Sequence, residues 1–408
     1  MSGLLSAIAP GRAQDVTRFA LGGAAPAHAV RPASVEEAAE VVRACAADGL
    51  ALVPWGGGVA LEGEAFEGRY DVALDLTGLD RVTVYDPDDF TVSAECGVTL
   101  ATLRAALLSH GHELPLEGAH GSRATLGGVL AANASGARRL RLGAPRDRIL
   151  GARFVTGDGV PARTGGRVVK NVAGHAVHRL LAGSRGGLGV LLEASLKLAP
   201  LPPARVALAY ECDAATLADA PRWAVFPRRE PAALTVLGRD AAAGLGDFAT
   251  PAAFTVVLGW EDEAAWLAKC EAFAVAKLGP PVSRAEGGAV PPIWQAAADL
   301  EEAKGPRLTF ASAHNTPAAV AFLAGRACAG RLVFHAPSGR LLLWPGPAEA
   351  EALVAELAGR GFTLAEARGV ALERPAPAVA IAALRASLRR SLDPAGVMAL
   401  GGRWERGE

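Results

Sequence analysis

Apolar positions in the first 200 residues follow a helical period in two places and a strand period in several others. A helix is predicted from Val35 to about Gly49, because apolar residues recur at three- and four-residue steps and Ser34 and Glu37 form a capping box. A second helix is predicted from Thr99 to near Gly111. Strands are predicted at Leu50–Val53, Val72–Leu76, Arg81–Tyr85, Thr91–Glu95, Ile149–Thr156 and Val190–Leu198.

Beyond residue 200 the pattern changes, and the prolines at 200, 202 and 203 mark a predicted domain boundary. Strands are predicted at Val206–Tyr210, Phe254–Leu258, Arg331–His335 and Arg340–Trp344. Helices are predicted at Glu261–Lys277, Pro291–Lys304 and Ala378–Ser391. The turns at Gly157-Asp158-Gly159 and Ala336-Pro337-Ser338-Gly339 each predict a hairpin. The pattern as a whole therefore predicts a mixed α+β protein of more than one domain.

Composition narrows the class of protein. Hydrophobic residues are 51% and charged residues 20% of the chain, which is typical of a globular protein, and the net charge of −1 favours neither nucleic acid nor an anionic membrane as a partner. The five cysteines are widely spaced without a C-x-x-C pair, which argues against iron–sulfur and zinc sites and predicts a cytoplasmic location. We expect no signal peptide and no transmembrane segment, so that any membrane contact is peripheral.

Three glycine clusters are the candidate ligand-binding segments. They lie at Gly56–Gly58, within Ala124–Gly136 and at Gly183–Gly189. A P-loop would need Gly-Lys-Ser/Thr, and a Rossmann fingerprint would need a helix directly after its glycines; the chain has neither pattern. Ala124–Gly136 alone is equally typical of a tight turn followed by a small-residue helix and of a backbone that approaches a flat or anionic ligand. Taken together, the clusters predict a pyrophosphate site built from the backbone N–H groups of three distant segments.

The motifs Pro-x-Gly-Gly-Gly, Ala-Thr-Leu-Gly-Gly…Asn-x-Ser-Gly and Gly-Ser-x-Gly-x-Leu-Gly-Val, in this order, resemble the FAD-binding domain of the vanillyl-alcohol oxidase / p-cresol methylhydroxylase (PCMH) superfamily. Within it, Arg167–Gly174 resembles the FAD-binding E subunits of bacterial glycolate oxidases. The resemblance implies an α+β fold with a PCMH-type two-subdomain FAD-binding domain at residues 25–203. A small α+β cap domain would follow at residues 204–345, and a C-terminal segment with a return helix at residues 346–408 would pack on the FAD domain.

The same resemblance implies the cofactor-binding residues. The pyrophosphate loop would be Gly56, Gly57, Gly58, Val59 and Ala60. The isoalloxazine and ribityl side would meet Thr125, Leu126, Gly127, Gly128, Asn133 and Gly136. The adenine end would meet Gly189 and Val190, and Leu116 and Glu117 would also approach the flavin.

This chain departs from the family pattern in several places. Val59 and Ala60 replace the usual hydroxyl residues, His175-Ala176 stands where relatives have Tyr-Asp, and Ala399-Leu400-Gly401 replaces a C-terminal Asn-Pro-Gly. No His or Cys stands at the positions of covalent flavin links in the family, so noncovalent FAD is expected. No metal is expected, and no catalytic residue is assigned.

Catalytic 2-hydroxyacid members carry a His-x-Gly-Asp-Gly-Asn-x-His segment, whereas this chain has only His314-Asn315 and a His335 expected to be structural. The resemblance therefore implies an FAD-dependent oxidoreductase subunit of a glycolate (2-hydroxyacid) oxidase complex. Its partners would be a larger catalytic FAD subunit and an iron–sulfur subunit. The alternatives are a self-sufficient FAD oxidoreductase acting on a small alcohol or 2-hydroxyacid, and a homologue that has lost flavin.

Several basic residues each allow two interpretations. His175 and His178 could share a helix face and hold a metal, or serve as capping or solvated residues. Lys170 could place a cation near the flavin, or be an ordinary surface lysine. The arginines of residues 138–148 could form a docking face for an acidic partner, or a solvated turn.

Overall fold

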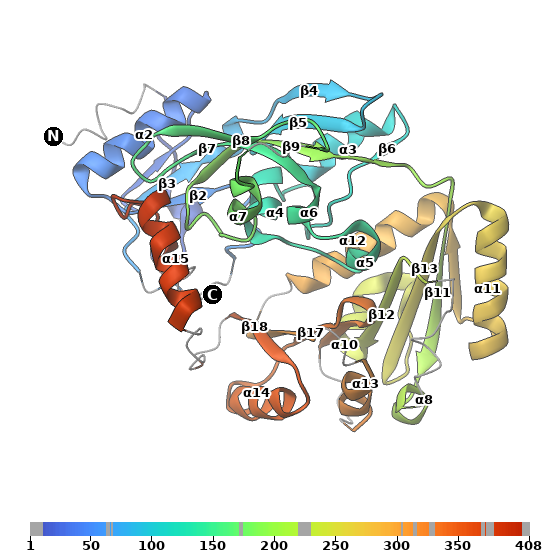
Figure 1. Ribbon diagram of the computed structural model, residues 1–408. Coiled ribbons are helices and arrows are strands. Elements are labelled where there is room, and N and C mark those ends of the chain that lie inside the picture. The colour runs from blue at the N-terminus through green and yellow to red at the C-terminus, as the bar shows by residue number, and fades with distance from the viewer. Residues whose placement is uncertain are drawn as a thin grey trace. The chain divides into compact units, whose positions relative to one another are not determined.

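The computed structural model describes residues 11–62, 66, 68–170, 174–218, 230–302, 305–312, 316–325, 331–368, 372 and 379–401 (Figure 1). The chain divides into two compact units. Unit 1 comprises Met1–Ala134, Ala144–Leu201 and Arg374–Glu408, and unit 2 comprises Ser135–Gly143 and Pro202–Glu373. These units differ from the domain limits expected from the sequence, because Ser135–Gly143 and residues 346–373 count with unit 2.

Unit 1 contains a parallel sheet and a larger antiparallel sheet. The parallel sheet has the order β1-β3-β2, with β1 at His28–Val30, β2 at Leu52–Trp55 and β3 at Val72–Asp75. The antiparallel sheet has the order β4-β5-β9-β7-β8. Its strands are β4 (Val82–Asp86), β5 (Thr91–Glu95), β7 (Ile149–Val155), β8 (Pro161–Gly165) and β9 (Val190–Lys197). A short ribbon pairs β6 (His112–Glu113) with β10 (Ala199–Pro200).

Side-chain caps and a left-handed glycine set the ends of helices in unit 1. In α2 (Val35–Asp48) the Ser34 side chain accepts from the Glu37 N–H, and Gly49 ends the helix in the left-handed region, so the predicted capping box and C′ glycine are both confirmed. Thr99 caps α3 in the same way. The remaining helical segments are η1 (Val16–Phe19), η2 (Leu76–Gly78), α3 (Leu100–Leu108), α4 (Leu126–Ala132), α6 (Pro145–Arg148), α7 (Val177–Leu181) and α15 (Val379–Leu392).

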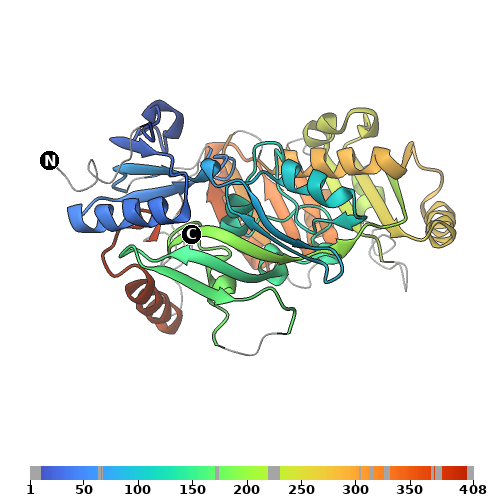
Figure 2. The same ribbon diagram turned by 90° about the horizontal axis from the view of Figure 1, so that it is seen from above.

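The core of unit 1 contains more than one apolar cluster. One cluster joins α2 to β2 and β3, and Figures 1 and 2 both show α2 lying along these strands. Val397 and Met398, from the C-terminal end of the described chain, belong to the same cluster. A second cluster packs α3 and α4 against β5, β7 and β9. The C-terminal segment after α15 is therefore part of the core of unit 1.

Unit 2 is built on one antiparallel sheet with the order β14-β11-β13-β12-β16-β17-β15-β18. Its strands are β11 (Ala204–Cys212), β12 (Ala233–Gly238), β13 (Phe254–Asp262), β14 (Ser283–Glu286), β15 (Arg307–Ala311), β16 (Leu332–His335), β17 (Arg340–Leu343) and β18 (Thr363–Arg368). β16 and β17 form the hairpin that the sequence predicts. Its α-helices are α5 (Arg139–Leu142), α8 (Ala214–Ala218), α10 (Arg239–Ala242), α11 (Ala264–Leu278), α12 (Val290–Glu301), α13 (Thr316–Gly325) and α14 (Ala350–Gly359). Four 3₁₀ segments complete unit 2: η3 (Ala243–Phe248), η4 (Gly287–Ala289), η5 (Ala336–Ser338) and η6 (Pro347–Glu349).

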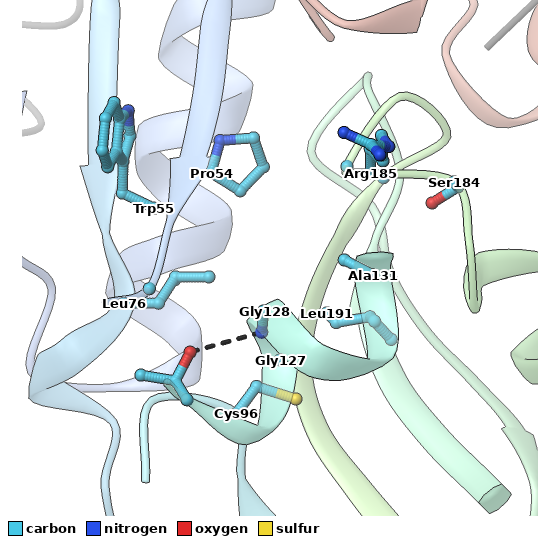
Figure 3. A pocket seen from close by; sticks show the side chains of 14 residues that line it. Pro54, Trp55, Leu76, Cys96, Gly127, Gly128, Ala131, Ser184, Arg185 and Leu191 are labelled. Atoms are coloured by element: carbon cyan, nitrogen blue, oxygen red, sulfur yellow. Dashed lines mark hydrogen bonds between the residues drawn. The ribbon is translucent and has the colours of Figure 1, made fainter. Parts of the chain in front are cut away.

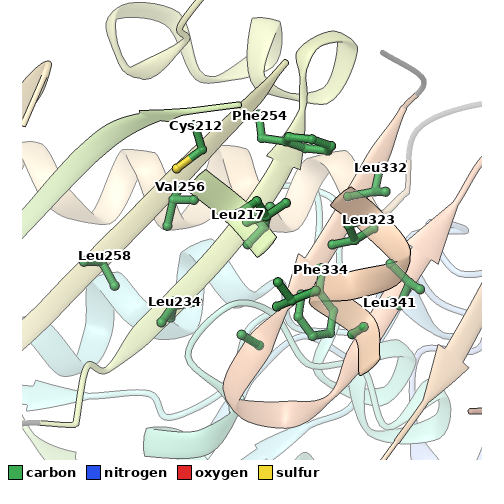
Figure 4. Packing of buried hydrophobic residues seen from close by; sticks show 14 of the residues in the cluster. Cys212, Leu217, Leu234, Phe254, Val256, Leu258, Leu323, Leu332, Phe334 and Leu341 are labelled. Carbon is green, nitrogen blue, oxygen red and sulfur yellow. The ribbon is translucent and has the colours of Figure 1, made fainter. Parts of the chain in front are cut away.

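The two faces of this sheet bury side chains of different size. One face packs large side chains against α8, α11, α13 and α14, and Figure 4 shows Leu258, Leu234, Phe334 and Leu341 following one another across neighbouring strands. The other face presents smaller residues, such as Ala207 and Ala209, to α10, α12 and η3. The alternation along β11 produces both faces, as the two-residue period of a strand requires. Among the described residues, no helix combines the length and the apolarity needed to cross a membrane.

Two local predictions are wrong. The helix predicted at Glu261–Lys277 begins only at Ala264, because Glu261 and Asp262 continue β13 opposite Arg205 and Ala204. His175 and His178 do not share a helix face, because α7 begins at Val177, after Gly174 with its φ of +76°.

Candidate functional site

A hollow in unit 1 lies where the three glycine segments meet. It is bounded by the end of β2, the first turn of η2, the end of β5, helix α4, the loop after α7 and the start of β9. The space inside it is about 440 Å³, counting the part open to solvent. Figure 3 shows the side chains that line it. The lining residues are Pro54, Trp55, Gly56, Leu76, Cys96, Thr125, Gly127, Gly128, Ala131, Ser184, Arg185, Gly186, Gly189 and Leu191.

The loop after β2 needs its glycines to pack against the segment that precedes α4. A Cβ atom on Gly56 would lie 2.1 Å from Oγ1 of Thr125, and one on Gly57 would lie 1.8 Å from the carbonyl oxygen of Arg123. Gly58 has a φ of +77°, which side-chain-bearing residues rarely adopt. Arg123 anchors this loop: it donates to the Gly57 carbonyl at 3.3 Å and forms an ion pair with Glu62.

The same loop has backbone donors that the protein does not use. Among the described residues, no acceptor lies against the N–H groups of Gly57, Gly58, Val59 and Ala60. Successive N–H groups in such a turn form a concave anion site without any basic side chain. The loop therefore has the donors that a pyrophosphate requires.

Helix α4 packs closely on its neighbours, and the N–H groups at its start all donate hydrogen bonds within the protein. Those of Leu126 and Gly127 donate to the carbonyls of Val98 and Cys96 at 2.9 and 2.7 Å. The Gly128 N–H donates to Oγ1 of Thr125 at 3.2 Å, the dashed line in Figure 3. A Cβ on Gly127 would lie 2.8 Å from that of Cys96, so glycine lets α4 lie directly on the end of β5.

The third segment is tied to the far end of α4. The Gly183 and Arg185 N–H groups donate to the carbonyls of Leu130 and Ala131 at 3.1 and 2.8 Å. Gly186, with a φ of +79°, comes close to Pro54, because a Cβ there would lie 3.1 Å from the proline ring. Gly189 has a φ of +153° and leaves no room for a Cβ beside the carbonyl of Val155. Hydrogen bonds and close packing thus hold the three glycine segments around one hollow.

The lining of the hollow is poor in ionisable groups. Arg185 is the one charged side chain among the described lining residues. Burial raises the pKa of the Cys96 thiol far above its ordinary value, so it stays protonated. Trp55 turns its indole N–H to the hydroxyl of Tyr70 at 2.5 Å. The described lining contains no carboxylate, imidazole or amine that could move a proton.

The predicted cofactor residues fall into two groups in the structure. Gly56, Thr125, Gly127, Gly128 and Gly189 line the hollow. Gly57, Gly58, Val59 and Ala60 continue the loop beside it. The others lie outside the lining: Leu116, Glu117, Leu126 and Val190 are buried, Asn133 ends α4, and Gly136 belongs to unit 2.

Sequence reasoning missed several lining residues. Gly186 could have been found, because it belongs to the third glycine cluster. Leu76, Cys96 and Leu191 stand at or beside strand ends without any local motif, and only the packing of the two sheets brings them together.

The other candidate residues have structural partners or lie elsewhere. His335 is buried and both ring nitrogens are engaged, by Thr235 at 2.9 Å and by Glu301 at 3.0 Å, which confirms its structural interpretation. His314 and Asn315 lie outside the described residues, as does Asn171 of the Arg167–Gly174 motif. The described residues include no cluster of three or more metal-ligating side chains.

The arginines of residues 138–148 do not form a single docking face. Arg138 and Arg141 bind the buried carboxylate of Glu261 inside unit 2, at 2.9 and 3.1 Å. Arg146 is exposed in unit 1 beside Asp147. Burial lowers the pKa of Arg148 in the same unit. The docking interpretation of this cluster is therefore wrong.

Comparisons with known proteins identify the class of this site. Residues 26–165 match the family described as "FAD binding domain". Glycolate oxidase subunit GlcE of Escherichia coli K12 is 44% identical over 151 residues, which are 36% of this chain and 43% of that protein. D-2-hydroxyglutarate dehydrogenase of Xanthomonas citri pv. viticola is 35% identical over 178 residues, covering 43% and 38% of the two chains. Glycolate oxidase subunit GlcD of Bacillus subtilis is 30% identical over 183 residues, covering 45% and 39%.

The fold extends beyond the matched domain. Two crystal structures of alkyldihydroxyacetonephosphate synthase superpose with TM-scores of 0.63 and 0.65, at 16% and 17% identity, over 92% of this chain and 76% and 77% of theirs. The matches with curated relatives span less than half of those proteins' length. Residues 26–165 are therefore similar to an FAD-binding domain, FAD is the cofactor, and the predicted PCMH-type fold is confirmed.

The structure fits this cofactor at two points. The unused N–H groups of residues 57–60 are suited to the pyrophosphate, and the apolar lining by Leu76, Leu191 and Cys96 is suited to a flat ring system. FAD, when bound, supplies a two-electron acceptor that no side chain can replace. The protein's part is to hold that group, exclude water and orient it.

Proposed function

We propose that this chain is the FAD-binding subunit of a glycolate or related 2-hydroxyacid oxidase complex and is not catalytically complete alone. The observation that carries the proposal is the hollow with the loop beside it: the loop has free backbone donors and the hollow has apolar walls, but no described lining residue of the hollow can take a proton. The 44% identity to a glycolate oxidase subunit supports the substrate class.

Oxidation of a 2-hydroxyacid requires a base at the carbinol and a cation for the carboxylate. Arg185 is the one cation of the lining, and no base accompanies it there. His335, the described histidine of the second half, has both nitrogens engaged inside unit 2. The missing base would come from a partner, and we propose a larger catalytic FAD subunit for that role, with an iron–sulfur subunit carrying the electrons onward.

The self-sufficient alternative makes a different prediction for the isolated chain. The full chain would be purified, supplemented with FAD, desalted and mixed anaerobically with glycolate or D-lactate while its visible flavin absorbance is recorded. We expect bound flavin that stays oxidised alone and is reduced once the co-purified partner subunits are added. Rapid bleaching of the isolated chain would establish the self-sufficient enzyme, and failure to hold any flavin would overturn both.

We further propose that the FAD is noncovalent. Cys96 is the one thiol of the described lining, and its raised pKa keeps it protonated and therefore a poor nucleophile. Acid precipitation of the holoprotein should release all flavin into the supernatant, whereas flavin that stays with the pellet would contradict the proposal. A cytoplasmic location also remains a proposal, and it agrees with the four described cysteines being free.

A further inference from the structure

One surface of unit 1 carries positive charge that the chain itself does not balance. Residues 160–181 contain four arginines or lysines and no Asp or Glu, although the whole chain has 41 basic and 42 acidic residues. We define the β8 surface as Arg163 of strand β8, Arg167, Val168, Val169 and Lys170 of the following loop, and Arg179 of α7. Figure 1 shows β8 and α7 side by side, and Thr164 on β8 joins them by donating to the carbonyl of His175 at 3.2 Å.

The charges on the β8 surface are exposed and unpaired. Arg163, Arg167, Lys170 and Arg179 are all exposed, and no carboxylate among the described residues forms an ion pair with any of them. Two exposed arginines elsewhere have carboxylate partners: Arg81 is paired with Glu95 at 2.8 Å, and Arg284 with Glu271 at 2.6 Å. The four cations of the β8 surface are therefore available to an outside anionic group.

Apolar side chains stand among these cations. Val168 and Val169 are 59% and 52% exposed, in a protein whose other valines are mostly buried. Both valines and Arg179 border one shallow polar hollow together with His175 and His178. Exposed apolar residues within a charged rim are typical of protein–protein interfaces.

Strand β8 adds a free backbone edge. It is the last strand of its sheet, and among the described residues it pairs with β7 alone, so its other side has backbone N–H and C=O groups without a strand partner there. Arg163 lies directly opposite Arg153 in that pair, and Arg153 already has Glu36 at 3.7 Å and Glu193 at 3.9 Å. Arg163 itself forms no ion pair with a described carboxylate and is left for an outside partner.

We propose that the β8 surface is the docking site for a carboxylate-rich face of a partner protein. The inference rests on the proposed function in one respect: the partner is a subunit of the same oxidase complex. A protein is favoured over an anionic membrane because the free strand edge can pair with another backbone, while the exposed apolar residues are small valines rather than bulky membrane-inserting side chains.

The test compares two charge reversals of equal size in the tagged full chain, expressed in its native host. One variant carries Arg163→Glu, Arg167→Glu and Lys170→Glu. The matched control carries Arg18→Glu, Lys269→Glu and Lys277→Glu, which are exposed positions outside the β8 surface. We expect the first variant to retain about tenfold less partner at low ionic strength, and the control to retain as much as wild type. Equal retention by the two variants would overturn the proposal.

A carbodiimide crosslink identifies the contact, because it joins a lysine amine directly to a carboxylate. The chain has five lysines, at positions 170, 197, 269, 277 and 304, so the products are easily resolved by mass spectrometry. We expect Lys170 to be joined to an Asp or Glu of the co-purified subunit. Lys170→Arg should abolish that crosslink and keep the docking. Crosslinks from the other lysines alone would overturn the proposal.

Two further outcomes separate this inference from others. If wild type retains no protein partner but binds vesicles of anionic phospholipid, and the first variant loses that binding, the surface is a membrane site and the proposal fails. Flavin absorbance of the same preparations tests the proposed function on its own: docking without flavin would overturn that function and leave the docking surface standing. Loss of docking with unchanged flavin content is the result expected here.

Discussion

The glycine-lined hollow of unit 1 and the buried ion clusters of unit 2 treat their polar groups in opposite ways. In the loop beside the hollow, the N–H groups of residues 57–60 have no acceptor among the described residues, and in the hollow itself Arg185 is the one charged side chain of the described lining. In unit 2, the buried Glu261 receives Arg138, Arg141 and Arg205 at 2.9–3.3 Å. Unit 1 thus keeps unused donors where a ligand is expected, whereas unit 2 uses its buried charges internally.

The difference shows which buried charges indicate function. Glu301 is fully buried; burial by itself would raise its pKa, but Arg340 and His335 outweigh that effect and hold the pKa below its usual range. Such a carboxylate is already neutralised by its neighbours and has no capacity left for a substrate. The cluster of His335, Glu301 and Arg340 is therefore engaged internally, and we propose the glycine hollow, whose described lining has no carboxylate, as the place where the cofactor binds.

The largest effect should come from removing the shared carboxylate of unit 2. Glu261→Ala takes away the common partner of Arg138, Arg141 and Arg205, and breaking a buried ion cluster typically costs about 3–5 kcal/mol. Denaturant unfolding followed by circular dichroism measures the loss. Glu271→Ala, which breaks the partly exposed pair with Arg284, is the control and should cost about 1 kcal/mol or less. Equal losses would mean that Glu261 is not structural.

The next prediction is a loss of FAD affinity when Gly57, in the loop beside the hollow of unit 1, is replaced. Gly57→Ala places a Cβ 1.8 Å from the Arg123 carbonyl, so the loop must move and its N–H groups lose their arrangement. We expect FAD affinity to fall by about 100-fold or more, measured by flavin fluorescence during titration of the apoprotein. Gly288→Ala, at a glycine of unit 2 with open space around it, should leave affinity unchanged. Unchanged affinity in both variants would mean that the loop does not hold the pyrophosphate.

Much of unit 1 could be predicted because its signals are local. Thr91–Glu95 is a strand with the predicted bounds, and α2 has the predicted caps at Ser34 and Gly49. The meeting of three glycine segments was also predictable from their order along the chain. Capping, turn and glycine preferences act within a few residues, so one sequence is enough to reveal them.

What escaped prediction depends on contacts between distant residues. Glu261 continues a strand instead of opening a helix, because Arg205 opposite it and two arginines more than a hundred positions earlier hold its carboxylate. The change from unit 1 to unit 2 between Ala134 and Ser135 has no signal in the local sequence. The resemblance places Gly57 in the pyrophosphate loop, and the structure adds that the Arg123 carbonyl occupies the side where a Cβ would stand. No local pattern contains these facts.

A smaller effect should distinguish two threonine caps. Thr125→Val removes the acceptor of the Gly128 N–H at the start of α4, and Thr99→Val removes that of the Thr102 N–H at the start of α3. Each should lower the free energy of unfolding by about 1 kcal/mol. Only Thr125→Val should also weaken FAD binding, because α4 lines the hollow and α3 does not. Equal effects on FAD affinity would mean that α4 is a scaffold and not a wall of the site.

The smallest effect concerns an ion pair at the surface of unit 1. The Ala33 N–H donates to the Glu37 carboxylate at 2.8 Å, and Arg12 adds a guanidinium at 3.0 Å; together they lower the pKa of Glu37. A carboxyl with a lowered pKa in the folded state contributes stability that is present above its unfolded pKa and is lost as pH falls through the folded pKa. Glu37→Gln should therefore be less stable than wild type near neutral pH by under about 1 kcal/mol, because the pair is partly exposed. Denaturant unfolding at a series of pH values should show that difference shrinking as pH falls below about 4.5, and a difference that grows on acidification would reverse the assignment.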